Sequence, residues 1–194
     1  MKAETTPRSA GPGRPRSFNR EMALTAALQL FWRQGYEATS LDDLTAAMKI
    51  SRSSFYGCFG SKHGVLVAAL ESYAAEAQAR LRAVAEAGPD AVPAMLEAIA
   101  NPQDGAQGCL LVNCITELAP HDPAVAELGR AHIAALEDMF AAALSPEAPE
   151  AAQVPARTLV SLAIGTLTLR KAGLPAEEIR ASLDLARSLF PARS

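Results

Sequence analysis

Five side chains that can bond a phosphate group lie close together in the first third of the sequence. They are Ser51, Arg52, Ser53, Ser54 and Tyr56. A serine or tyrosine hydroxyl can donate a hydrogen bond to a phosphate oxygen or to an acceptor on a base edge, and a guanidinium adds a charged, fork-shaped donor. These residue types indicate recognition of a nucleic acid.

Further polar groups flank this segment. Thr39 and Ser40 stand where a helix is expected to begin, so their hydroxyls and the free N–H groups there can meet a DNA backbone. Lys62 brings a positive charge to the start of another helix, where the helix dipole already favours anions. Arg14 and Arg16 lie in a polar N-terminal arm that can reach a minor groove or a phosphate.

Two short helices joined by a tight turn are expected to position these groups. Leu44 and Met48 give a helix over residues 41–48 one apolar face. Ser51 is a good N-cap for a second helix over about 52–59. Such a pair is a helix-turn-helix, whose second helix can lie in the DNA major groove.

The start of the first of these helices can be capped in two ways. Ser40 with Asp43 forms one capping-box pattern, and Thr39 with Asp42 forms an overlapping one. The sequence leaves the choice open. In the second helix, Phe55 is the expected inward anchor, so the hydroxyl groups around it are free to face a duplex.

The rest of the chain also favours helix. The 194 residues are 49% hydrophobic, rich in alanine and poor in β-branched residues, and few runs alternate with period two. We expect an all-α fold of about nine helices. Their approximate ranges are 19–34, 41–48, 52–59, 62–86, 93–100, 107–118, 122–144, 155–172 and 176–189.

The apolar pattern of the chain indicates a cytoplasmic protein, and the uneven distribution of its charges indicates a polyanionic partner. No apolar run approaches the ~18 residues of a membrane helix, and the N-terminus lacks the apolar centre of a signal peptide. We therefore expect a cytoplasmic location and no membrane partner. Residues 1–62 hold nine Lys and Arg against five Asp and Glu, whereas residues 63–194 hold nine against sixteen. The basic half is the half with the helix-turn-helix.

The TetR family of bacterial transcriptional regulators has an N-terminal DNA-binding domain that this chain resembles in GRPR (13–16) and in ALQLFWRQGYEATSLDDLTAAMKISRSSFYGCFGSKHGVLVAAL (27–70). The matching features are Phe31, Gly35, Tyr36, Thr39, Ser40, Leu44, Ala46, Ala47, Ser51, Phe55, Tyr56, Phe59, Lys62 and Leu66. The chain departs from the family pattern at His63 and Gly64, and a glycine in the first turn is expected to weaken that helix slightly. The segment 108–125 is similar, more weakly, to the regulatory domain of one subgroup.

This resemblance implies the organisation of the whole chain. A basic arm over 1–16 precedes a helix-turn-helix domain over 17–77, and residues 78–194 form a helical domain for ligand binding and dimerisation. The resemblance also implies a homodimer through the last two helices, about 155–189. A dimer is expected on physical grounds too, since one short helix reads only a few base pairs.

The resemblance implies a DNA-binding regulator, most often a repressor, that binds a palindromic operator and a small-molecule effector. We expect the effector to be mostly apolar, because residues 78–194 offer many aliphatic side chains and few polar ones. The candidate lining residues are Met95, Cys109, Asn113, Glu117 and Met139. Nothing in the sequence requires a cofactor.

Other interpretations remain beside this one. Cys58, Cys109 or Cys114 can switch the same regulator by oxidation or reaction with electrophiles, although packing roles are favoured for all three. His121 and His132, with Cys114, are metal-ligand types whose spacing matches no compact zinc pattern, so we expect no metal. No catalytic pattern points to an enzyme. A constitutive architectural DNA binder is the remaining alternative.

Overall fold

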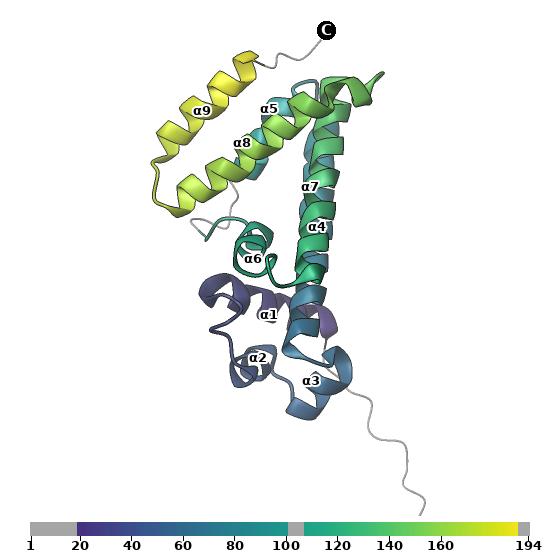
Figure 1. Ribbon diagram of the computed structural model, residues 1–194, viewed down its shortest axis with the longest axis vertical. Coiled ribbons are helices and arrows are strands. Elements are labelled where there is room, and N and C mark those ends of the chain that lie inside the picture. Colours follow the sequence, from purple (N-terminus) through teal and green to yellow (C-terminus); the bar gives the residue numbers. More distant parts are fainter. Residues whose placement is uncertain (1–18, 101–106, 190–194) are drawn as a thin grey trace, which may run out of the picture.

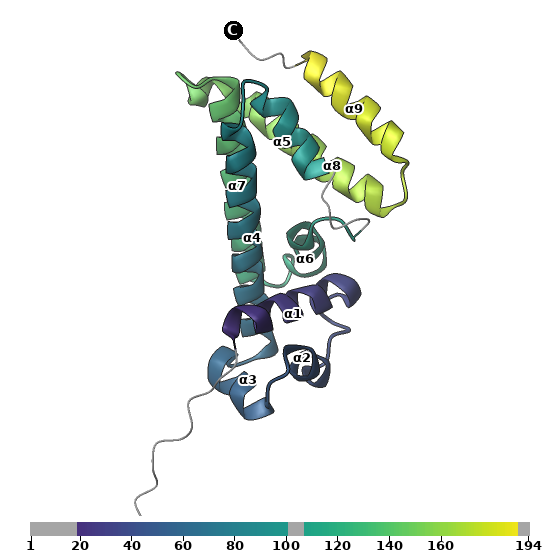
Figure 2. The same cartoon turned by 180° about the vertical axis from the view of Figure 1, so that it is seen from behind.

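The computed structural model describes residues 19–100 and 107–189, and within these ranges the regular elements are all helical (Figures 1 and 2). The predicted all-α class is confirmed, and the α-helix boundaries lie within three residues of those expected. In chain order the elements are α1 (Arg20–Gln34), α2 (Leu41–Met48), α3 (Arg52–Phe59), α4 (Lys62–Glu86), α5 (Ala91–Ala100), α6 (Leu110–Leu118), α7 (Pro123–Leu144), the 3-10 helix η2 (Pro149–Ala152), α8 (Gln153–Lys171) and α9 (Ala176–Leu189).

The first three helices and the start of α4 form a head at one end of the molecule (Figure 1). Leu44, Phe55 and Leu66 come from α2, α3 and α4, and each is fully buried in its core. The turn between α2 and α3 contains Lys49 in the left-handed region, with φ 55°. Gly60, with φ 73°, ends α3. These two residues with positive φ end α2 and α3, the pair of short helices expected from the sequence.

α4 and α7 run side by side from the head toward the far end of the molecule (Figures 1 and 2). With 25 residues, α4 is about 37 Å long at the usual rise per residue. Leu66, near its start, is buried in the core of the head, whereas Leu81 is buried in the core at the far end. A rigid helix that belongs to both cores mechanically links them.

The second core lies between α5, α7, α8 and α9. Its fully buried side chains include Met95, Phe140 and Leu159. α6 lies between the two ends of the molecule, and its buried residues, Leu111 among them, belong to the core of the head. The boundary predicted after residue 77 falls inside α4, where the helix continues without a break.

Two local features of the backbone were not evident from the sequence. α5 begins at Ala91 rather than at Pro93, because a proline in the first turn removes no intrahelical hydrogen bond. A Cβ atom on Gly64 would lie 2.1 Å from the carbonyl oxygen of Phe59. That oxygen already accepts a hydrogen bond from the N–H of Ser61 at 2.8 Å. The turn between α3 and α4 is therefore too tight for a side chain at position 64.

Within the described ranges, no helix combines the length and the apolar character needed to cross a membrane.

Candidate nucleic-acid interface

α3 presents one polar face to solvent and one aromatic face to the core. Phe55 and Phe59 are buried, and Phe55 lies edge-on to the ring of Tyr56 with centroids 5.6 Å apart. Arg52, Ser53 and Tyr56 are exposed, and Tyr56 keeps 54% of its accessible surface. The aromatic anchor thus fixes which side of α3 faces outward, and the predicted recognition side chains lie on that side.

The serines at the start of α3 are engaged in capping. The Ser51 hydroxyl oxygen accepts a hydrogen bond from the N–H of Ser54 at 3.1 Å, and the two hydroxyl oxygens are 3.1 Å apart. Ser51 is exposed and Ser54 is half-buried. Ser51 Oγ donates to Ser54 Oγ, so a contact from Ser51 to a phosphate oxygen requires its hydroxyl proton to turn away from Ser54.

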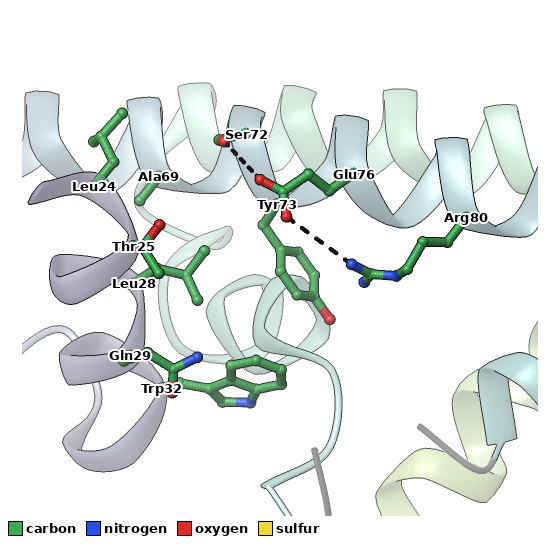
Figure 3. Close-up of a pocket in the computed structure, with 10 residues that line it drawn as sticks. All are labelled: Leu24, Thr25, Leu28, Gln29, Trp32, Ala69, Ser72, Tyr73, Glu76 and Arg80. Atoms are coloured by element: carbon green, nitrogen blue, oxygen red, sulfur yellow. Dashed lines mark hydrogen bonds and ion pairs between the residues drawn. The ribbon is translucent and has the colours of Figure 1, made fainter. Parts of the chain in front are cut away.

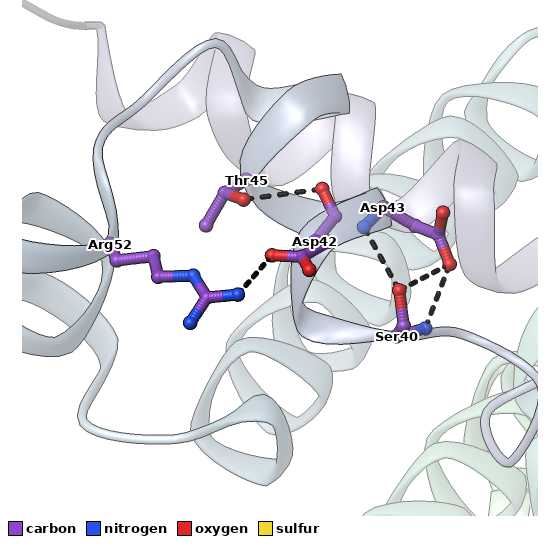
Figure 4. Close-up of polar contacts among 5 residues, drawn as sticks. All are labelled: Ser40, Asp42, Asp43, Thr45 and Arg52. Carbon is purple, nitrogen blue, oxygen red and sulfur yellow. Dashed lines mark hydrogen bonds and ion pairs between the residues drawn. The ribbon is translucent and has the colours of Figure 1, made fainter.

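The start of α2 resolves the choice between the two capping boxes (Figure 4). Ser40 Oγ accepts from the N–H of Asp43 at 3.1 Å, and Asp43 Oδ2 accepts from the N–H of Ser40 at 3.0 Å. The hydrogen bonds from the Ser40 side chain and backbone also lower the pKa of Asp43. Ser40 remains exposed, so it is the hydroxyl residue here that a DNA backbone can approach.

Thr39 has a different environment from the one expected. Its side chain is 1% exposed, and its hydroxyl donates to the carbonyl oxygen of Gly35 at 2.6 Å. Its N–H donates to the carbonyl oxygen of Tyr36 at 3.1 Å. In this structure Thr39 closes the turn between α1 and α2, and neither of its donors is directed outward.

Two of the basic residues predicted to contact DNA, Arg52 and Lys62, have partners within the protein. Arg52 Nη2 is 2.5 Å from Asp42 Oδ1, and the hydrogen bond to that carboxylate raises the pKa of Arg52 (Figure 4). Lys62 Nζ lies 4.3 Å from the centre of the Tyr36 ring and 3.4 Å from the carbonyl oxygen of Glu37. Contacts within the protein thus already orient both side chains when no duplex is bound.

The predicted arm over residues 1–16, with Arg14 and Arg16, lies outside the described residues.

Contacts between the head and the rest of the molecule were not expected from the sequence. The carboxylate of Glu117, on α6, accepts hydrogen bonds from the N–H groups of Tyr36 at 3.3 Å and Glu37 at 3.1 Å. His63 Nε2 lies 2.7 Å from Oδ2 of Asp122, the N-cap of α7. Because the partners are 59 to 81 residues apart, no local pattern signals these pairs.

The five predicted effector-binding residues are distributed over both ends of the molecule. Met95 and Met139 belong to the core at the far end, whereas Cys109 packs against the core of the head. Asn113 donates to the carbonyl oxygen of Gln107 and accepts from Lys171 Nζ at 3.0 Å. Glu117, as described above, contacts the head. Their common role in binding stays a prediction.

Two hollows occur elsewhere in the described part of the molecule. One of about 110 Å³ lies between α1 and α4, where Trp32 and Tyr73 meet edge-on with ring centroids 5.4 Å apart (Figure 3). A second, of about 150 Å³, lies between α5, α8 and α9 and includes Leu96 and Ile179. None of the five predicted effector-binding residues lines either hollow. Among the described residues, no group of three or more His, Cys, Asp or Glu side chains is placed to hold a metal ion.

Comparison with known proteins identifies what this arrangement resembles. Residues 23–69 match the family described as bacterial regulatory proteins, tetR family. The HTH-type transcriptional repressor ComR of Escherichia coli (strain K12) is 38% identical over 115 residues, which are 56% of this chain and 55% of ComR. The uncharacterized HTH-type transcriptional regulator YezE of Bacillus subtilis (strain 168) is 34% identical over 135 residues, which are 66% of this chain and 69% of YezE. The match thus spans only about half the length of ComR.

The fold has a solved counterpart bound to DNA. A cysteine mutant of the TetR family transcriptional regulator CifR, complexed with 26-bp double-strand operator DNA, is similar with a TM-score of 0.79 and 27% sequence identity. The similarity covers 92% of this chain and all of that chain. It therefore extends over the head and the larger helical part together.

Proposed function

Since the chain belongs to the TetR family of bacterial regulatory proteins, and is thus a transcriptional regulator and not an enzyme, we propose that it represses transcription as a homodimer bound to a palindromic operator. The supporting observation is the outward face of α3, where Arg52, Ser53 and Tyr56 are exposed above a buried aromatic anchor. The likeness to a regulator solved with operator DNA supports the same function.

Each α3 helix enters the major groove of one half-site in this proposal. The N-terminal residues of a recognition helix meet base edges, and Arg52 and Ser53 occupy those positions in α3. Tyr56 and Lys62 contact phosphates at the edges of the groove. Two α3 helices in a dimer then lie about one duplex turn apart, roughly 34–36 Å.

Selection of bound duplexes from a random pool tests the proposal and is expected to return a palindrome. Tyr56→Phe and Lys62→Ala should weaken binding to all sequences alike, because phosphate contacts carry no sequence information. The salt dependence should also become shallower for Lys62→Ala. Glu97→Gln, on α5 and remote from the head, serves as a control that leaves binding unchanged. A chain that selects no sequence contradicts the proposal, and unchanged affinity in both variants contradicts the phosphate assignments.

We propose that the dimer forms through α8 and α9, over about residues 155–189. Two large apolar side chains in this part stay exposed in the protomer: Leu169 keeps 47% of its surface and Leu185 keeps 62%. Leu185→Glu should yield a folded monomer, which sedimentation measures directly. Met22→Glu is a matched control, because Met22 is 71% exposed but lies on α1. A dimeric Leu185→Glu variant would move the interface elsewhere.

Release from the operator follows from linkage with a small, mostly apolar effector. An effector that prefers a different arrangement of the two heads shifts operator affinity by its differential binding, typically about 5–150-fold. α4 supports this coupling, since its two ends are buried in the two cores. The lining by Met95, Cys109, Asn113, Glu117 and Met139 is part of the proposal. Screening apolar compounds for operator release, with Asn113→Ala and Met139→Ala as variants, tests it.

A thiol switch is the second candidate, and one observation favours it. Cys58 is exposed on α3, the helix proposed to meet the duplex. Cys109 is half-buried and Cys114 is buried. Oxidation or alkylation of Cys58 would add bulk at the interface. If operator release by oxidants persists unchanged in Cys58→Ser, Cys109→Ser and Cys114→Ser, the thiol mechanism is wrong.

A further inference from the structure

An ion pair joins the first turn of α2 to the first turn of α3 across the helix-turn-helix (Figure 4). Asp42 lies in α2, and Arg52 is the first residue of α3. The side chains are 71% and 64% exposed. The capping box uses Ser40 and Asp43, so the Asp42 carboxylate is not needed for that cap.

Protein stability accounts poorly for this pair. Exposed ion pairs contribute little to folding, because water solvates the separated charges well and ordering two flexible side chains opposes the attraction. The first turn of α2 already contains the carboxylate of Asp43, which satisfies the favourable interaction with the helix dipole. The consequence of the Asp42–Arg52 pair is therefore to be sought where α3 meets a ligand.

At a duplex, the Asp42 carboxylate competes with DNA phosphates for the same guanidinium. Non-specific binding to DNA comes from cations that neutralise phosphates and release counterions. An Arg52 that Asp42 already neutralises does not displace a counterion from DNA. Breaking the pair would also leave the Asp42 carboxylate unpaired beside the polyanion. The Arg52 guanidinium has five N–H donors, however, and the pair occupies only part of them.

We propose that Asp42 is a specificity-determining residue that acts as an internal counter-charge for Arg52, lowering affinity for DNA of arbitrary sequence. The remaining donors of Arg52 gain a partner only where a base edge presents correctly placed acceptors, as guanine does with O6 and N7. Asp42 thus widens the gap between operator and non-operator binding. This inference rests on the proposed DNA-binding function.

The test compares the wild-type dimer with Asp42→Asn, Arg52→Ala and the double variant on a random-sequence duplex and on the selected operator. Every additional phosphate that a cation neutralises steepens the slope of log affinity against log salt by about 0.9, equivalent to about 3.5-fold per subunit between about 50 and 200 mM salt. For two subunits, the loss of random-sequence affinity between about 50 and 200 mM salt should therefore be about 12-fold larger in Asp42→Asn than in the wild type. Its ratio of operator to random-sequence affinity should fall. Asp138→Asn, an exposed carboxylate on α7, makes the same change in charge and should leave both quantities unchanged.

The double variant separates an effect through Arg52 from simple repulsion between Asp42 and DNA. In the Arg52→Ala background, Asp42→Asn should change neither the slope nor the ratio. An equal change in that background, or an unchanged slope and ratio in Asp42→Asn alone, overturns the inference while leaving DNA binding itself intact. A wild-type chain that binds no duplex overturns the proposed function and the inference together.

Discussion

Gly64→Ala is a substitution for which two physical effects predict opposite signs. Gly64 is in the first turn of α4, where alanine is favoured over glycine by about 1 kcal/mol on helix propensity alone. The added Cβ would, however, lie 2.1 Å from the carbonyl oxygen of Phe59, and real Cβ atoms essentially never come within 3.0 Å of a non-bonded heavy atom. The backbone must open by about 0.9 Å, the difference between these two distances.

The steric effect is expected to exceed the propensity effect. Phe59 O is a backbone atom held by the N–H of Ser61, so no side-chain rotation relieves the overlap. Overpacking that forces backbone shifts costs about 1–3 kcal/mol, and we expect the upper end here. Subtracting the propensity gain leaves a net destabilisation of about 2 kcal/mol, which for a chain of this size lowers Tm by about 4–8 °C.

Thermal unfolding followed by circular dichroism measures this difference, and operator affinity gives a second measure. Operator binding should weaken as well, because displacing Phe59 shifts the end of α3. Gly88→Ala is the matched control: its Cβ meets no atom within 4 Å, and the substitution should leave Tm unchanged or slightly raised. A Gly64→Ala protein that melts at or above the wild-type temperature would refute the steric reasoning.

Three further substitutions or treatments have defined outcomes. Burial lowers the pKa of His132, so on acidification the unfolded chain binds a proton on this side chain before the folded chain does. The free energy of unfolding should therefore fall as pH drops below about 6.5. His132→Gln should flatten this pH dependence in denaturation curves measured across the same range. Burial raises the pKa of the Cys114 thiol to about 12, so iodoacetamide should modify the exposed Cys58 before Cys114. Mass spectrometry measures the two rates, and equal rates would contradict the burial of Cys114. Gly129→Ala would place a Cβ 2.7 Å from two side-chain atoms of Ile115, an overlap that costs about 1–3 kcal/mol, and the helix propensity of alanine offsets about 1 kcal/mol of this, so the net loss should be at most about 2 kcal/mol. Adding Ile115→Ala should make the losses measured in urea non-additive, and simple additivity would exclude the clash.

The short-range features of the head were predictable because each depends on residues a few positions apart. Ser51 caps α3 and Phe55 is buried, as its spacing and residue types indicated. Where two local patterns overlapped, the sequence could not choose. Burial of Thr39 makes that choice, since its hydroxyl bonds Gly35 and leaves Ser40 to cap α2.

The predicted effector site shows where reasoning from residue types ends. Residue types alone place Glu117 in a ligand-binding space, as a polar residue in an apolar segment. In the structure its carboxylate accepts hydrogen bonds from the N–H groups of Tyr36 and Glu37, about 80 residues earlier in the chain, and the sequence contained no sign of this contact. Such a contact depends on how α6 packs against the head, and no periodicity within α6 encodes it.

The sequence by itself determined the helices and the outward face of α3, because these follow from local hydrogen bonding and from the period of apolar residues. Only the tertiary structure decided which polar groups and which backbone atoms come into contact. Asp42 neutralises Arg52, Asp122 pairs with His63, and a carbonyl oxygen excludes a side chain at Gly64. Electrostatic and steric contacts act over a few ångströms in space, and chain separation does not specify those distances.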